Sequence, residues 1–247
     1  MVATELRELS TSATAITNDP AAHAVLREAH DAGYKFPAGF AGFAATLTFI
    51  EDGEAVTGHV TVKAPREIEF EIAADEAALG WLRQEIDSMA GHRWPSPYEA
   101  GDGRWTLTLG DDATHPLGQT VTVHDDPFHS SYRLRDGRIS QVNRQMGGTK
   151  FTITILDHQP ATDGRTLPSL FTVTFWDIAS GRLTRADAYT DRYAAVSGAS
   201  LPVGRRVVTS SDTGQVTREL ILIGHELLID EASDGPADVA RRPHGGR

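Results

Sequence analysis

Two arginines, Arg133 and Arg144, stand among apolar residues in the segment that runs from Tyr132 to His158. A guanidinium group binds a carboxylate or a phosphate through two parallel hydrogen bonds, and it stays charged when it is partly buried. If both side chains reach one apolar face, their chemistry is that of a pocket for an anionic head group. The first question is therefore which face of the chain carries them.

Two tight turns divide this segment into three short strands whose pairing can be counted. Asp136-Gly137 and Gly147-Gly148 suit two-residue hairpin loops, because such loops need positive φ angles. Counting back from the second turn pairs Met146 with Thr149, Arg144 with Phe151, Val142 with Ile153 and Ser140 with Ile155, and counting from the first turn pairs Arg133 with Ser140. Cross-strand partners share a face. We therefore expect both arginines on one face, together with apolar side chains from the same strands.

Two alternatives to an anion pocket remain open for these arginines. Asp187 and Asp191 alternate with Tyr189 and Tyr193 on one face of a later strand, so either carboxylate could pair with a buried arginine. A buried arginine without a partner is costly, which favours such an ion pair. The face that carries Arg144 could also be the one turned toward solvent.

The histidines offer a second kind of chemistry. His92 and Arg93 follow a helix, where a cation favours the negative end of the helix dipole, or where both could stand at the rim of a pocket. His124 to His129, HDDPFH, is the densest group of metal-binding side chains, but its spacing matches no known ligand pattern, and Pro127 favours a turn. The sequence contains no nucleophile elbow and no phosphate loop. It names no cofactor, and we assign no metal ligands and no catalytic residues.

Alternating apolar residues dominate the rest of the chain. Helical spacing follows Asp19-Pro20 and Asp75, and about a dozen segments between residues 43 and 229 alternate with period two. So wide an antiparallel sheet must curl, and two amphipathic helices are available to cover one face. We predict a mainly β (α+β) fold, a half-barrel wrapped over two helices with a cavity between them. Residues 19–230 form one domain in this interpretation, with disordered segments at 1–18 and 231–247.

Composition limits the possible partners. With 23 basic and 34 acidic residues the net charge is −11, which argues against nucleic acid as a partner. The chain has no cysteine, so it has neither disulfides nor thiolate metal ligands. It shows no basic, apolar leader and no apolar run of about 18 residues, so we expect no membrane span and a cytoplasmic location. The oligomeric state stays open.

Four short motifs resemble an uncharacterised domain-of-unknown-function family of photosynthetic bacteria and plastids. They are Val56 to Val62, HRWP at His92 to Pro95, Tyr132 to Arg144, and DRYAAVSGASLP at Asp191 to Pro202. The resemblance spans about residues 20–228 and implies that His92, Arg93, Asp191 and Tyr193 are worth considering as site residues. It departs from the family at Gln145 to Gly147, where members are richer in histidine. The expected architecture is also similar in outline to bacterial lipoprotein carriers, which hold acyl chains in such a cavity.

These observations favour a binding or carrier protein for a small amphiphilic, acidic molecule held in the cavity of the sheet. Its expected ligand-binding residues are Arg133, Arg144, His92, Arg93, Asp191 and Tyr193. One alternative is an enzyme that acts on a small hydrophobic substrate there, with a metal held by His92, His124 and His129. Another is an interaction module with an exposed apolar patch.

Overall fold

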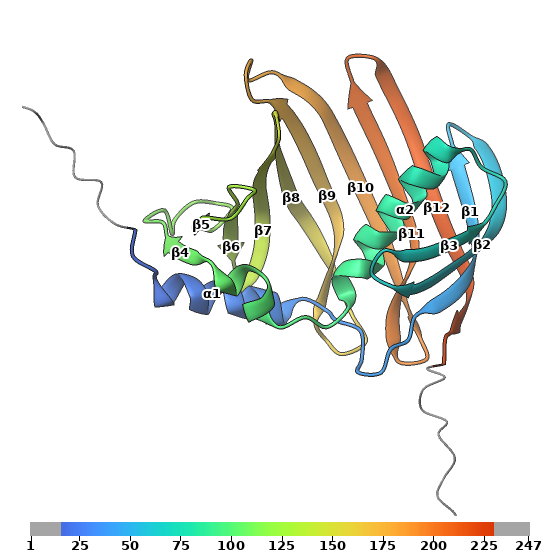
Figure 1. The fold of residues 1–247 in the computed structure, drawn as a ribbon, viewed down its shortest axis with the longest axis horizontal. Helices are drawn as coiled ribbons and strands as arrows, with labels where there is room; N and C mark the ends of the chain where they lie inside the picture. The colour runs from blue at the N-terminus through green and yellow to red at the C-terminus, as the bar shows by residue number, and fades with distance from the viewer. Residues whose placement is uncertain (1–15, 230–247) are drawn as a thin grey trace, which may run out of the picture.

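The structure of the chain, a computed structural model, describes residues 16–229. It contains one sheet of twelve strands and two α-helices, which confirms the predicted fold class (Figure 1). The helices are α1 (Pro20–Ala32) and α2 (Glu76–Ala90), followed by the short 3-10 helices η1 (Gly91–Arg93), η2 (Tyr98–Ala100) and η3 (Asp102–Arg104). The strands are β1 (Phe43–Glu51), β2 (Glu54–Ala64), β3 (Glu67–Glu71), β4 (Thr106–Leu109), β5 (Gln119–His124), β6 (Ser131–Arg135), β7 (Arg138–Met146), β8 (Thr149–Pro160), β9 (Thr166–Asp177), β10 (Leu183–Val196), β11 (Ala199–Ser211) and β12 (Gly214–Leu227). The disorder predicted for residues 1–18 and 231–247 falls almost entirely outside the described residues.

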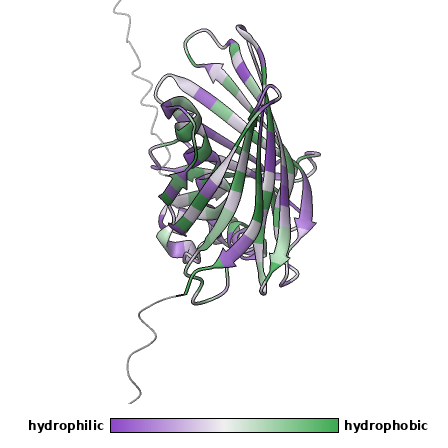
Figure 2. Cartoon of the chain, turned by 90° about the vertical axis from the view of Figure 1, so that its right-hand side faces the viewer, coloured by the Kyte–Doolittle hydropathy of each residue, from purple (hydrophilic) through white to green (hydrophobic). Residues whose placement is uncertain are grey.

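The sheet is antiparallel and runs in the order β3-β2-β1-β12-β11-β10-β9-β8-β7-β6-β5-β4. Strands β4 to β12 form a continuous meander, and the N-terminal strands are added at its far side because β1 pairs with β12. Figure 2 shows the sheet bending around the helices, which lie on one side of it. The concave face is therefore the one that carries the core.

Helix α1 covers one end of this concave face. Asp19 caps it as expected, its Oδ1 accepting a hydrogen bond from the Ala21 amide at 2.8 Å. Its apolar stripe packs on β4, β6 and β7. The resulting core consists of Ala22, Leu26, Ala29, Tyr98, Leu107, Val121, Val123, Tyr132 and Leu134.

Helix α2 covers the other end. Asp75 caps it through a 2.8 Å hydrogen bond from the Ala78 amide to Oδ1. Leu82, Ile86 and Met89 are fully buried against β1, β2, β11 and β12 in the larger of the two main cores. No helix within residues 16–229 has both the length and the apolar character needed to cross a membrane.

The middle of the concave face lies between the two helices (Figure 1). A small apolar cluster there is centred on Val173, Tyr189 and Val207, and its other members are only partly buried: Trp81, Phe151, Ile153, Phe171 and Phe175. Two separately packed ends thus flank an apolar strip on β8 to β10 that neither core covers completely.

Candidate anion-binding cavity

A cavity of about 390 Å³ opens on the concave face between α1, η1 and strands β7 to β9. The segment after α1 borders the cavity next to the start of β9. The Tyr34 amide donates to the Thr166 carbonyl at 3.0 Å and holds this segment against β9. One wall is apolar and consists of Ile139, Val142, Ile153, Ile155 and Pro168. The rest of the lining carries charged and imidazole side chains, so the cavity combines the apolar and polar chemistry of a site for an amphiphile.

Arg144 enters this cavity from β7. Its Nη2 donates to the Tyr132 hydroxyl at 2.8 Å, and that hydroxyl donates in turn to Asp102 Oδ2 at 2.8 Å. The Nε of Arg144 is buried and has no hydrogen-bond partner among the described residues. The predicted pairings of Arg144 with Phe151 and of Val142 with Ile153 are confirmed. Arg144 therefore stands on an apolar face, as expected, and carries unused hydrogen-bonding capacity.

His92 and Arg93 reach the same cavity from η1. Two contacts hold this turn in place, because Lys35 Nζ donates to the His92 carbonyl at 2.8 Å and the Phe36 amide donates to the Arg93 carbonyl at 2.7 Å. The Nε of Arg93, like that of Arg144, is buried without a partner in the part of the chain that the structure describes. The structure thus brings three of the six expected site residues together: His92, Arg93 and Arg144.

The electrostatic environment of the cavity is positive. Burial lowers the pKa of His92 although solvent still reaches the residue, and the Arg93 guanidinium lowers it further. Burial also lowers the pKa of Lys35 and of His158, with Arg93 and Arg138 respectively adding to the effect. Cationic neighbours therefore disfavour further positive charge at three separate positions of the lining.

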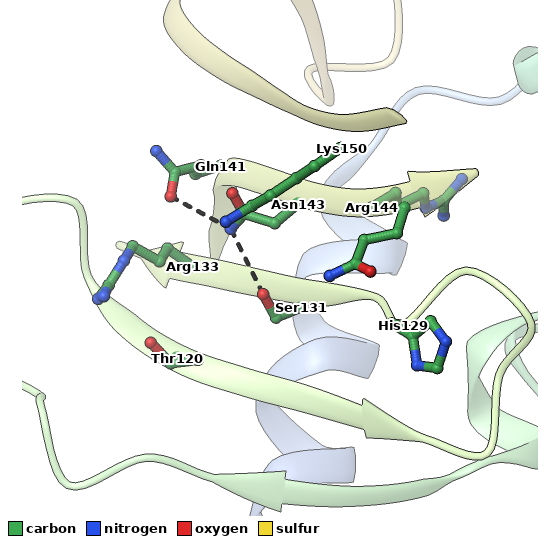
Figure 3. A pocket seen from close by; sticks show the side chains of 9 residues that line it. Thr120, His129, Ser131, Arg133, Gln141, Asn143, Arg144 and Lys150 are labelled. Atoms are coloured by element: carbon green, nitrogen blue, oxygen red, sulfur yellow. Dashed lines mark hydrogen bonds between the residues drawn. The ribbon is translucent and has the colours of Figure 1, made fainter. Parts of the chain in front are cut away.

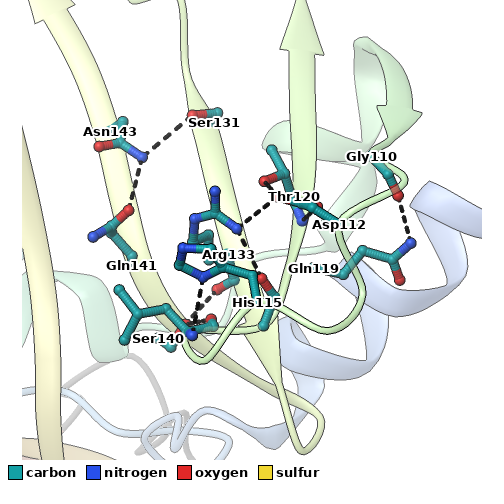
Figure 4. Close-up of polar contacts among 12 residues, drawn as sticks. Gly110, Asp112, His115, Gln119, Thr120, Ser131, Arg133, Ser140, Gln141 and Asn143 are labelled. Carbon is teal, nitrogen blue, oxygen red and sulfur yellow. Dashed lines mark hydrogen bonds and ion pairs between the residues drawn. The ribbon is translucent and has the colours of Figure 1, made fainter.

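Arg133 does not join this group, and the prediction that it shares a face with Arg144 is wrong. A bulge at Ser140 pairs Arg133 with Gln141 in place of Ser140, and this shift of one residue turns the side chain to the outer face. The Ser140 hydroxyl donates to the carbonyls of Leu117 and Arg133, which holds the bulge (Figure 4). The pairing counted from the Asp136-Gly137 turn assumed no bulge.

On the outer face, Arg133 Nη1 binds Asp112 Oδ2 at 2.7 Å and the Gly118 carbonyl at 2.9 Å (Figure 4). It lines a polar hollow of about 280 Å³ on this face with Ser131, Gln141 and Asn143 (Figure 3). Arg144 borders this hollow as well as the concave cavity. Hydrogen bonds from Thr120, and then the Arg133 guanidinium, hold the pKa of Asp112 well below its usual range. Arg133 is therefore an ion-pair partner on the other side of the sheet.

Asp187 and Asp191 are not partners of Arg144. Asp187 lies 3.1 Å from Arg185 Nε, and Asp191 binds Arg205, whose Nε and Nη2 donate to its two oxygens at 2.7 and 2.6 Å. Arg205 Nη1 also donates to Glu85 Oε2 at 2.6 Å, which ties β10 and β11 to α2. The expected internal ion pair exists, but a different arginine forms it.

Tyr193 is buried beside this ion cluster, with its hydroxyl 3.4 Å from Asp191 Oδ2. Burial raises the pKa of Tyr193, while the cations Arg93 and Arg205 act in the opposite direction. Neither Asp191 nor Tyr193 lines the cavity. Neither residue faces the space that a ligand would occupy.

The three histidines considered for a metal do not converge. His92 lines the concave cavity, His129 lines the hollow on the outer face (Figure 3), and His124 Nε2 is 2.8 Å from the Thr108 hydroxyl. Among residues 16–229, no three histidine or carboxylate side chains lie close enough together to hold a metal ion.

Several lining residues were missed by sequence reasoning, namely Lys35, Asp102, Tyr132, Arg138 and His158. Lys35 and Asp102 lie outside the strands, in segments with no periodicity to follow. Irregular pairing between Ile155 and His158 places His158 beside Pro168, where simple alternation fails. Tyr132 was missed because the bulge at Ser140 places it opposite Val142, whereas the register counted from the sequence pairs it with Gln141.

No curated protein matches the chain. Among solved structures it is similar to a LolA superfamily protein from Nitrosomonas europaea, with 12% identity, coverage of 84% of this chain and 93% of that one, and a TM-score of 0.37. It is also similar to a protein described as an outer membrane lipoprotein-sorting protein domain from Vibrio parahaemolyticus, with 9% identity, coverage of 85% and 94%, and a TM-score of 0.38. At these scores the similarities support no inference about a ligand. The model of one protein family matches residues 17–228, which include every element that forms the cavity, and the chain therefore belongs to DUF3386, a family of proteins of unknown function.

Proposed function

We propose that this protein binds, and serves as a carrier for, a small amphiphilic molecule whose acidic head group lies in the cavity beside Arg93 and Arg144. One observation carries the proposal. These two guanidinium groups come from different elements, line one cavity, have no ion-pair partner within residues 16–229, and each leave a buried Nε without an acceptor. An anionic ligand would supply the missing negative charge.

The energetics of the unliganded site support this proposal. A buried donor without a partner costs about 1–3 kcal/mol, and the cost is higher for charged groups. Two such groups beside one cavity are expensive for folding alone, whereas guanidinium groups that are already held at the cavity favour the binding of an anion there. A buried polar group without a partner in a native structure needs an explanation, and a bound ion or a catalytic role is one.

The apolar part of the ligand has a surface next to the head group. Ile153 belongs both to the cavity wall and to the partly buried strip on β8 to β10. From there the strip continues to Phe171 and Phe175, and burying it under a hydrocarbon tail would release about 25 cal/mol per Å² of apolar surface. We place the tail of the ligand along this strip.

The proposal is tested with the fluorescent fatty acid cis-parinaric acid. We expect wild-type protein to bind it with enhanced fluorescence, and Arg144→Leu to weaken binding by on the order of tenfold or more, since a hydrogen bond to a charged group contributes about 1.5–3 kcal/mol. The matched control is Arg206→Leu, the same substitution at an exposed position that does not line the cavity. Absence of binding to the wild-type protein, or equal loss in both variants, contradicts the proposal.

A further inference from the structure

The charges that line the cavity are unbalanced. Four cations, Lys35, Arg93, Arg138 and Arg144, face it with a single carboxylate, Asp102. The imidazoles of His92 and His158 have pKa values below the ordinary 6.5, so both are neutral at pH 7. The lining therefore holds a surplus of three positive charges in a protein whose net charge is −11.

Most of the other cations within residues 16–229 are paired with carboxylates, whereas those that line the cavity are not. Ten other lysine and arginine side chains within residues 16–229 form ion pairs: Arg27, Lys63, Arg133, Arg135, Arg165, Arg182, Arg185, Arg192, Arg205 and Arg218. None of the four cations in the lining forms one with a described residue. The chain has more carboxylates than basic side chains, yet Asp102 is the single carboxylate in the lining of the cavity.

Acids just outside the lining do not cancel the surplus. Asp87 acts on His92 and Asp157 acts on His158, and each raises the imidazole pKa. After burial, however, the larger effect at His92 comes from Arg93 and the larger effect at His158 comes from Arg138, and both lower the pKa. At two ends of the cavity the cations thus prevail over the nearest carboxylates.

We infer that the head group of the ligand is a dianion of the phosphate monoester class, an inference that rests on the proposed function. A phosphate monoester carries about −1.5 to −2 charges at pH 7 and has three strong acceptor oxygens, whereas a carboxylate has one charge and two oxygens. Arg93 on η1 and Arg144 on β7 approach from different elements, so one phosphoryl group can accept from both guanidinium groups. Its third oxygen remains for Lys35 Nζ, which uses one of its three donors on the His92 carbonyl.

Four compounds separate charge, shape and tail: decyl phosphate, decyl sulfate, decanoate and inorganic phosphate. Each is titrated into the full chain by calorimetry, below micelle-forming concentrations and at about pH 8, where a phosphate monoester with a second pKa of about 6 is fully dianionic. Decyl sulfate has the same tail and three terminal oxygens as decyl phosphate but only one charge. We expect decyl phosphate to bind at least about tenfold more tightly than decyl sulfate or decanoate.

The outcomes distinguish this inference from the proposed function. Equal affinity for all three decyl compounds contradicts the inference of a dianionic head group but agrees with the proposed binding of an amphiphile. If inorganic phosphate binds as tightly as decyl phosphate, the site prefers a dianion but the ligand is free phosphate. That result contradicts the proposal that the ligand is an amphiphile. Failure of all the decyl compounds to bind overturns both.

Substitutions in the cavity test whether its lining residues cause the preference for decyl phosphate. Arg93→Gln should reduce the preference for decyl phosphate over decyl sulfate. Arg138→Gln, at an exposed position of the rim, provides the same test with little risk to folding. Arg206→Gln is the control outside the cavity, and an unchanged preference in both lining variants, with native circular dichroism, contradicts the inference.

Discussion

The same substitution at two arginines of the concave face should change stability in different ways. Arg144→Leu removes a hydrogen bond from a charged donor to the Tyr132 hydroxyl, which contributes about 1.5–3 kcal/mol, and also removes a buried Nε whose missing partner costs about 1–3 kcal/mol or more. No carboxylate loses its only partner, because the Tyr132 hydroxyl still donates to Asp102 at 2.8 Å. We therefore expect the free energy of unfolding to change by less than about 1 kcal/mol, or to increase.

Arg205→Leu should be strongly destabilising. The Arg205 side chain is 2% exposed, and it is bound to Asp191 and Glu85, which are 2% and 5% exposed. Its removal leaves buried carboxylates without a countercharge, a change that costs about 3–5 kcal/mol out of a typical total of 5–15 kcal/mol. Adding Glu85→Gln and Asp191→Asn should restore part of this loss, which keeps the test informative if the single variant does not fold.

Urea denaturation at pH 7.5, followed by tryptophan fluorescence, measures both variants in one experiment. The reasoning predicts a difference of about 3 kcal/mol or more between the two substitutions, seen as a much lower midpoint for Arg205→Leu. If Arg144→Leu loses more than about 2 kcal/mol, and Asp187→Asn or Asp191→Asn then restores it, Arg144 is half of a structural ion pair and the pocket interpretation fails.

Two further predictions concern protons. Burial raises the pKa of Glu85 above the ordinary 4.5 despite the opposing effect of Arg205. The stability that Glu85 contributes is therefore complete below pH 4.5 and declines as the pH rises through its pKa in the folded state. Urea titrations from pH 4.5 to 7.5 should show a smaller decline in the free energy of unfolding for Glu85→Gln than for wild type. His92 is neutral at pH 7.5 in the free protein, and a bound anion raises its pKa, so decyl phosphate should bind with proton uptake that His92→Gln reduces. Calorimetry in buffers of different ionisation enthalpy measures the number of protons taken up. Equal proton uptake in wild type and His92→Gln would contradict a role for His92.

Local turn chemistry determines which parts of the site could be predicted from the sequence. The Gly147-Gly148 hairpin allows only one register, and it correctly placed Arg144 opposite Phe151. Capping at Asp19 and Asp75 located both helices, and alternation identified the concave face of β1 and β3. These features depend on residues close together in the chain, so a single sequence contains the information.

The errors arise where distant segments change a strand. The bulge that turns Arg133 outward is held by a hydrogen bond from Ser140 to the Leu117 carbonyl, which belongs to a loop 23 residues earlier. Arg205 owes its burial to Glu85, which lies 120 residues away on α2. The residues near Arg133 and Arg205 in the sequence do not predict these distant contacts. A shift of one residue in strand pairing is enough to move a side chain to the other face of the sheet.

The acidic composition of the chain and an anionic ligand are compatible, because they act over different distances. Surface charges separated by more than about 8 Å are largely screened at physiological ionic strength, so a net charge of −11 has little effect inside a cavity lined by Arg93 and Arg144. Nucleic acid needs a broad basic surface to displace many counterions, and a net acidic protein offers little of it. A single small anion needs only one positive cavity. The acidic surface therefore argues against polyanions while leaving a site for one head group, and the unpaired cations of the lining would account for that selectivity.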